Sequence, residues 1–384
     1  MKSPFLLVLA IVPALAGTPD FSDNIGDEDS PAHRNPLSFF SGIQRIDLGQ
    51  DLLHSADIDV QRSTVLYQLE KNTWTFEANL AFTDIGVDYS DPVGATSRAF
   101  IREQSWSGGL TLGTNLADSL LATLGFSTYE GFIDFQSAWI SEYYDQFVGI
   151  PFAGTYRPAS PEGRALSTGL VWDYAPGIGR ITANASYSKD DIVPAWSAIP
   201  NPDNFFIPEA QATIDALDTY QASITWEAAL NPTLRSQLTL RYSDITVRDP
   251  RYQLRSQWAW AMTSRLTART HLGGAIERPD FEAFYGGVTL DYEINSNWSI
   301  STSARLYRDT GEVVSAGFNT AAPALDSYEL SASVAWTNGT TTIRLGAGIY
   351  DTDYDEPDED NQFFANLYEH RDYFLGRFAL SHNF

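Results

Sequence analysis

The chain has 384 residues and a formal net charge of −25 at pH 7, which excludes the phosphate backbone of nucleic acid as a partner. It has no cysteine, and aromatic residues make up 13% of it, a share that suits β-strands and membrane interfaces better than helices. After residue 16, no segment approaches the ~20 consecutive apolar residues of a membrane helix.

The first sixteen residues have the pattern of a signal peptide. A lysine precedes an apolar run over residues 5–16, and a small-x-small cleavage site ends this run at Ala16. A buried N-terminal helix is the alternative, which Pro13 disfavours. We therefore predict a signal peptide over residues 1–16, followed by an acidic segment over residues 17–41 that lies outside the folded core.

Apolar and polar residues alternate through residues 42–384 in segments of about ten residues. In residues 220–228 and 298–306, for example, the even positions are mostly apolar and the odd positions are polar. This length and this period of two are typical of strands that cross a membrane with one face in lipid.

Short turns and longer loops alternate between these segments. The short turns lie near residues 71–73, 115–118, 175–179, 231–233, 263–264, 295–297 and 338–339. The longer loops lie near residues 84–102, 129–164, 189–217, 244–252, 274–281, 308–326 and 351–371. With residues 42–53 as the first strand, this order predicts an all-β fold, a closed antiparallel up-and-down transmembrane barrel of about 16 strands, with 14 to 18 as the acceptable range. Closure leaves no open sheet edge, which lipid requires.

Aromatic residues mark both ends of the predicted strands. Close to the short turns, on the apolar phase, lie Trp74, Trp172, Trp226, Trp260, Trp298 and Trp336. Close to the longer loops, on the same phase, lie Tyr187, Tyr220, Tyr242, Phe284 and Tyr328. Two such belts are expected where a barrel meets the two membrane interfaces.

The polar phase carries many arginines and, by our sequence count, fewer acidic residues. We predict that the interior is lined by Arg180, Arg235, Arg241, Arg255, Arg269, Arg305, Arg344, Glu227, Asp291 and Glu329. These residues fit two interpretations equally well. They form salt bridges that stiffen the wall, or they form an arginine-lined surface that selects anionic solutes.

Nothing in the sequence supports catalysis, a metal centre or a cofactor. The five histidines are scattered, and there is no Gly-x-Ser-x-Gly motif and no Gly-rich phosphate loop. His271 falls on the polar phase, where we expect an interior histidine without a catalytic role. The aspartates between Asp351 and Asp355 alternate as in a calcium loop. Glycine is missing at the sixth position and an acid at the twelfth, which favours an acidic surface loop.

The last segment, residues 372–384, alternates up to its final residue, Phe384, with phenylalanines on one face and Arg377 on the other. It resembles the closing strand of Gram-negative outer-membrane β-barrel proteins, in which the terminal aromatic belongs to the signal read by the assembly machinery. The resemblance implies that Phe384 is an assembly signal and that the partners are this machinery, outer-membrane lipids and lipopolysaccharide. It places the chain in the outer membrane, with residues 17–41 in the periplasm.

This resemblance implies a porin-like channel for passive diffusion of small hydrophilic solutes, including anions. Porins of this size often form trimers, and in porins the third outer loop narrows the pore. Residues 129–164 occupy that position; packing over the mouth and an additional hairpin are the alternatives for them. A structural or accessory barrel that anchors surface polymers or partner proteins is the second hypothesis, and a lipid-modifying enzyme is a third and weaker one.

Overall fold

A computed structural model describes residues 44–71, 73–88, 100–131, 162–191, 196–199, 209–212, 217–246, 249–278, 281–311, 323–355 and 369–384. All regular secondary structure in these ranges is β-strand. Within the same ranges no helix is long and apolar enough to cross a membrane. The predicted signal peptide, the acidic segment 17–41 and nearly all of 129–164 lie outside the described residues.

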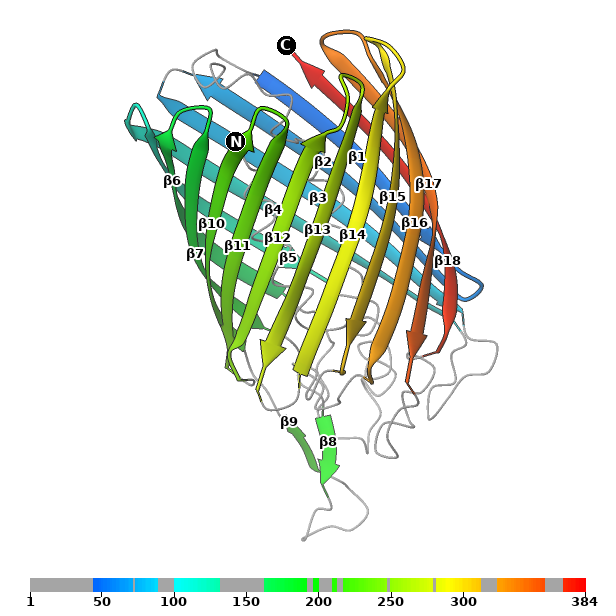
Figure 1. Cartoon of the computed structure of the whole chain (residues 1–384). Helices are drawn as coiled ribbons and strands as arrows, with labels where there is room; N and C mark the ends of the chain where they lie inside the picture. Colours follow the sequence, from blue (N-terminus) through cyan, green and yellow to red (C-terminus); the bar gives the residue numbers. More distant parts are fainter. Residues whose placement is uncertain are drawn as a thin grey trace.

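Sixteen strands pair with their neighbours and form one closed barrel (Figure 1). They are β1 (Gln44–His54), β2 (Ile58–Lys71), β3 (Trp74–Asp88), β4 (Phe100–Ala117), β5 (Leu120–Glu130), β6 (Glu162–Ala175), β7 (Gly179–Asp191), β10 (Leu217–Asn231), β11 (Leu234–Ile245), β12 (Arg251–Ala261), β13 (Leu266–Glu277), β14 (Phe281–Glu293), β15 (Trp298–Asp309), β16 (Leu325–Thr337), β17 (Thr341–Tyr354) and β18 (Arg371–Asn383). The predicted fold class and strand number are confirmed.

The barrel closes where the first strand meets the last. β1 pairs with β18 in antiparallel register from Arg45 opposite Asn383 to His54 opposite Phe374. Next to this seam, the backbone N–H of Phe384 donates a hydrogen bond of 2.9 Å to the carbonyl of Gln44. Because β1 and β18 pair with each other, no barrel strand presents an unpaired edge.

The two ends of the barrel differ in their connections. At one end, the short-turn end, adjacent strands are joined by tight turns such as Asn338-Gly339, where Gly339 has a φ of +90° that glycine adopts without strain. The other end, the long-loop end, carries the longer connections. Two of these are shorter than the predicted loops 244–252 and 274–281, because residues 246–250 and 278–280 suffice to join their strands, and residues 55–57 join β1 to β2.

One further pair of strands lies outside the barrel. β8 (Trp196–Ile199) and β9 (Glu209–Ala212) form an antiparallel hairpin between β7 and β10. Figure 1 shows this hairpin beyond the long-loop end of the barrel. The sequence predicts a loop over residues 189–217, since strands of four residues are too short to establish a clear alternation.

Each barrel strand has two faces of opposite character. The outward face exposes large apolar side chains, among them Leu124, Leu330 and Ile349, which are 62%, 57% and 64% exposed. The opposite face carries serines, threonines, arginines and carboxylates. This is the reverse of a soluble protein, whose apolar side chains gather inside.

Candidate functional site

The register places every predicted interior residue on one face of the sheet. Directly paired residues of neighbouring strands lie on the same face. Arg235 lies opposite Ala259, which in turn lies opposite Arg269, and the remaining predicted positions follow the same phase. A cavity in the barrel wall is lined by Arg269, Arg305, Glu329 and Arg344, so this face is the interior.

Several interior arginines form ion pairs with acidic residues. Arg180 Nε lies 2.6 Å from Asp173 Oδ1, and Arg269 Nε lies 2.8 Å from Asp291 Oδ2. At the closing seam, Arg377 Nε lies 2.8 Å from Asp51 Oδ1. For these arginines, the interpretation as salt bridges that stiffen the wall is the better one.

The interior is less positive than the sequence count suggested. The same face also carries Asp47, Asp51, Glu70, Asp190, Glu277 and Asp309. The prediction that acidic residues on this face are fewer than arginines is therefore wrong. It failed because most of these acids lie on the first two strands or near strand ends, where the sequence pattern did not reveal their phase.

Three interior arginines differ from the others. Arg235, Arg241 and Arg305 form no ion pair with the residues that the structure describes. Arg305 lies directly opposite Glu329 in the register of β15 and β16, yet the two side chains do not approach as an ion pair. The Nε of Arg305 is buried and has no hydrogen-bond partner in the described part of the protein.

The wall cavity extends from β13 across β18 to β1. Serines on β15 and β16 form its middle, and Ser301 lies opposite Ser333. On β17, Gly346 lies opposite Ser333 and Arg377. A Cβ at Gly346 would meet the Ser333 Cβ at 3.3 Å and the Arg377 Cβ at 3.6 Å. The small residues therefore make a recess between longer arginine side chains.

The inner wall at the long-loop end is covered rather than open. Inward-facing side chains are buried there on strands all round the barrel, and the apolar ones include Leu53, Ile58, Ile85, Leu217, Ile245, Phe281, Leu325 and Tyr373. One pair of buried charges lies among them. Arg251 Nη2 lies 2.8 Å from Glu277 Oε2, with both side chains about 95% buried, and the guanidinium lies 3.9 Å above the ring of Phe281.

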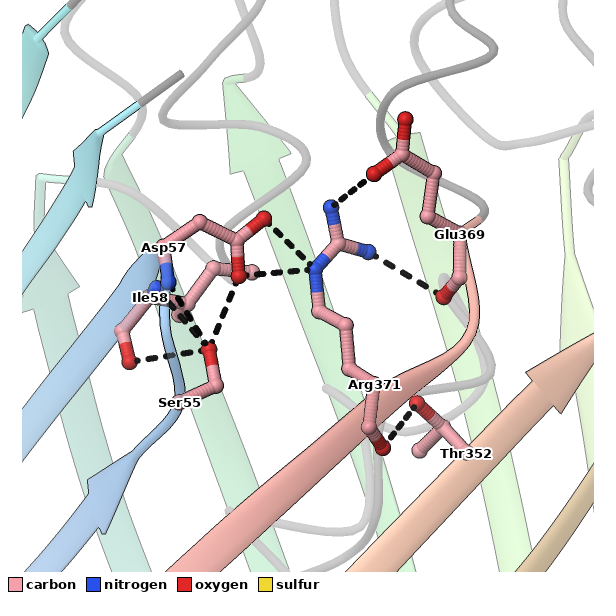
Figure 2. A network of polar contacts seen from close by, with 6 residues as sticks. All are labelled: Ser55, Asp57, Ile58, Thr352, Glu369 and Arg371. Atoms are coloured by element: carbon pink, nitrogen blue, oxygen red, sulfur yellow. Dashed lines mark hydrogen bonds and ion pairs between the residues drawn. The ribbon is translucent and has the colours of Figure 1, made fainter. Parts of the chain in front are cut away.

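A second buried arginine links β18 to the β1–β2 connection at this end (Figure 2). Arg371 of β18 donates from Nε to Asp57 Oδ1 and Oδ2 at 3.2 and 3.0 Å, and from Nη1 to the carbonyl of Glu369 at 3.3 Å. Ser55 holds the β1–β2 connection by accepting a hydrogen bond from the Ile58 N–H at 2.9 Å and donating to Asp57 Oδ1 at 2.9 Å. This network fixes the connection against β18.

The predicted aromatic belts lie on the outward face. Trp74, Trp172, Trp226, Trp260 and Trp298 are exposed near the short-turn end, and Trp336, which pairs with Trp298, is half-buried. Near the long-loop end, Tyr220 and Tyr328 are 56% and 59% exposed. The tilted rings of Tyr187 and Tyr220 lie 5.1 Å apart between centroids, and those of Tyr242 and Tyr252 lie 5.4 Å apart.

An acidic group on the outward face corrects one expectation. Asp351 and Asp353 belong to β17 rather than to a surface loop. Asp351 lies opposite Asp372, and His370 Nε2 lies 3.5 Å from Asp351 Oδ2. Three ligand atoms of Asp351, His370 and Asp372 lie within 4.8 Å of one another, but these side chains are exposed or half-exposed. Exposed acidic groups of this kind are common on protein surfaces, so their proximity alone does not define a metal site.

Two further predicted residues, His271 and Phe384, lie close to aromatic or imidazole rings. His271 lies on the interior face, with its ring centroid 6.4 Å from that of Tyr285. Phe384 is 71% exposed, and its ring lies 4.6 Å from that of His382. The absence of an enzymatic function and the role of Phe384 in assembly stay predictions.

No protein-family model and no curated protein matches the sequence. Among solved structures, the chain is similar to CdiB from Acinetobacter baumannii, with 8% identity and a TM-score of 0.51, over 89% of this chain and 60% of CdiB. It is also similar to a bacterial polysaccharide outer membrane secretin, with 8% identity and a TM-score of 0.48, over 89% and 98%. For the CymD monoaromatic hydrocarbon channel the identity is 9% and the TM-score 0.45, over 94% and 92%.

Such identities indicate the fold alone. The likeness to CdiB supports the large β-barrel. It does not show what this chain transports or binds. No characterised porin family follows from it.

Proposed function

We propose that this chain is an outer-membrane barrel through which small hydrophilic solutes diffuse passively. The observation that carries the proposal is the sorting of the two faces of one closed sheet. Apolar side chains with aromatic residues at both strand ends face outward, and polar side chains with a wall cavity face inward. Exposing such an outer face to water would cost much free energy. Soluble proteins accordingly rarely expose extended apolar surface.

Membrane insertion is testable before any transport is measured. The full chain, folded in detergent or lipid vesicles, is expected to show a β-rich circular dichroism spectrum and to migrate more slowly in gels after boiling. In cells it is expected in the outer-membrane fraction. Recovery in the soluble periplasmic fraction would contradict the proposal. Cross-linking of the folded protein tests the predicted homotrimer.

Conductance in planar lipid bilayers tests the channel itself. The purified folded chain is expected to give discrete current steps in potassium chloride, while the boiled sample gives none. An uncharged sugar should also enter vesicles that contain the folded chain, measured by the rate at which they swell.

The covered inner wall at the long-loop end favours one alternative, an accessory barrel without an open pore. Such a barrel would insert into membranes and pass the gel and fractionation tests. It would give neither current nor vesicle swelling. The pair of experiments therefore separates the two functions.

A further inference from the structure

We infer that the wall cavity between β13 and β1 binds the oxyanion group, a carboxylate or a phosphate, of a small hydroxylated solute. The inference rests on the proposed channel function and specifies the class of solute. We call this recess the serine–arginine cavity; it is defined by Arg269, Arg305, Arg344, Arg377, Ser301, Ser303, Ser331 and Ser333.

The charge of the serine–arginine cavity is positive, although that of the whole chain is strongly negative. Arg269 and Arg377 are each neutralised by an aspartate, at 2.8 Å in both cases. Of the other two arginines, Arg305 forms no ion pair with the described residues, whereas Arg344 has further contacts; Glu329 is the one further carboxylate among the lining residues. An anion is therefore attracted to this part of the wall, and Glu329 limits the attraction.

Arg305 has capacity to bind a solute. It forms no ion pair with the described residues, and its Nε is a buried donor without a partner there. A buried N–H donor without a hydrogen bond destabilises the protein. A solute acceptor that reaches this N–H therefore gains more free energy than it would by bonding to a donor that water already satisfies. A guanidinium presents parallel N–H donors whose spacing matches the two oxygens of a carboxylate or a phosphate.

The small residues give the cavity its shape and its further hydrogen bonds. Ser301 and Ser303 on β15 lie opposite Ser333 and Ser331 on β16, so four hydroxyls lie within two adjacent strands. Gly346 keeps the space next to Ser333 free of a side chain. Serine hydroxyls both donate and accept, and therefore suit the hydroxyls of a sugar acid or a sugar phosphate.

Apolar solutes are disfavoured in this cavity, although Leu52, Ala332, Ala347 and Leu375 also line it. A hydrocarbon would cover guanidinium and hydroxyl groups without offering them hydrogen bonds, which costs free energy. An anion with hydroxyls satisfies both kinds of group. The mixed charge also keeps binding weak enough for release, which conduction requires.

The test measures how added solutes block chloride current through the full chain in planar bilayers. Gluconate and inorganic phosphate serve as the two anionic probes, and sorbitol serves as the uncharged probe of gluconate's size. Gluconate and phosphate are expected to reduce the current at millimolar concentrations at which sorbitol has no effect. A stronger block by gluconate than by phosphate identifies a hydroxylated carboxylate, and the reverse order identifies a phosphate.

Two variants locate the effect. Arg305→Gln is expected to raise the half-blocking concentration of the anion about tenfold, since it removes a charge-assisted hydrogen bond. Arg235→Gln is the matched control, because Arg235 is also an interior arginine without an ion pair but lies outside the cavity. Its half-blocking concentration is expected to stay within about twofold of the unchanged protein. If Arg305→Gln does not fold, as judged by gel migration, Ser333→Leu fills the cavity at constant charge and should weaken the block likewise.

The outcomes separate the two proposals. Absence of any current in the unchanged protein would contradict the channel function. Normal current that gluconate, phosphate and sorbitol affect equally would overturn the oxyanion site while leaving the channel intact. The same shift in Arg305→Gln and Arg235→Gln would also overturn it, because the effect would then come from the general charge of the interior.

Discussion

Replacing Arg251 by methionine is predicted to destabilise the barrel more than any exposed charge change. Arg251 and Glu277 are about 95% buried, and both Nε and Nη2 of Arg251 lie within 2.9 Å of Glu277 Oε2. Removal of the arginine leaves the Glu277 carboxylate without its cation, and Asp309 also loses its electrostatic interaction with Arg251. Breaking a buried pair on one side typically costs about 3–5 kcal/mol. The folding equilibrium constant should therefore fall by about 10²–10⁴.

The assay is reversible urea unfolding of the full chain in lipid vesicles, followed by tryptophan fluorescence. The double variant Arg251→Met with Glu277→Met is expected to recover most of the loss, since it removes both charges and keeps the volume. Arg308→Met is the control at the same end, because the Arg308–Asp326 pair is exposed and should contribute little. A double variant as unstable as the single one would refute the reasoning, because the cost would then not come from an uncompensated carboxylate.

Three further changes test other parts of the structure. Arg371→Met should cost about 1–3 kcal/mol in the same urea assay, less than Arg251→Met, because the Asp57 carboxylate that it leaves unpaired is partly exposed. A loss equal to that of Arg251→Met would mean that the partial exposure of Asp57 does not lower the cost of the unpaired carboxylate. Leu330→Arg, on the outward face of β16, should cost about 2–4 kcal/mol in vesicles, and an unchanged midpoint would show that this face is not in lipid. Gly348→Ala should lower the folded fraction on gels, since its Cβ would lie 2.7 Å from the Leu330 carbonyl oxygen, whereas Gly376→Ala meets ordinary contacts and should fold normally.

The sequence assigns most residues of the candidate site to one face of the sheet. It does not show which residues their side chains contact. The period of two places Arg235, Arg269 and Arg305 on one face in any sheet that contains their strands. It does not reveal that Arg269 is paired and Arg305 is not. That difference depends on side-chain conformation as well as register, because Glu329 lies directly opposite Arg305 and the two still form no ion pair.

The sequence by itself determined the all-β fold, the strand number and the face of the side chains on strands with clear alternation. Alternation assigns the faces residue by residue, and the spacing of turns sets the number of strands, so both are local properties. Only the tertiary structure decided the contacts across the seam. Arg377 meets Asp51, 326 residues away, and Arg371 meets Asp57, 314 residues away. These pairs, the covered wall and the serine–arginine cavity exist because the closed barrel brings β1 beside β18 in one particular register, which no local pattern specifies.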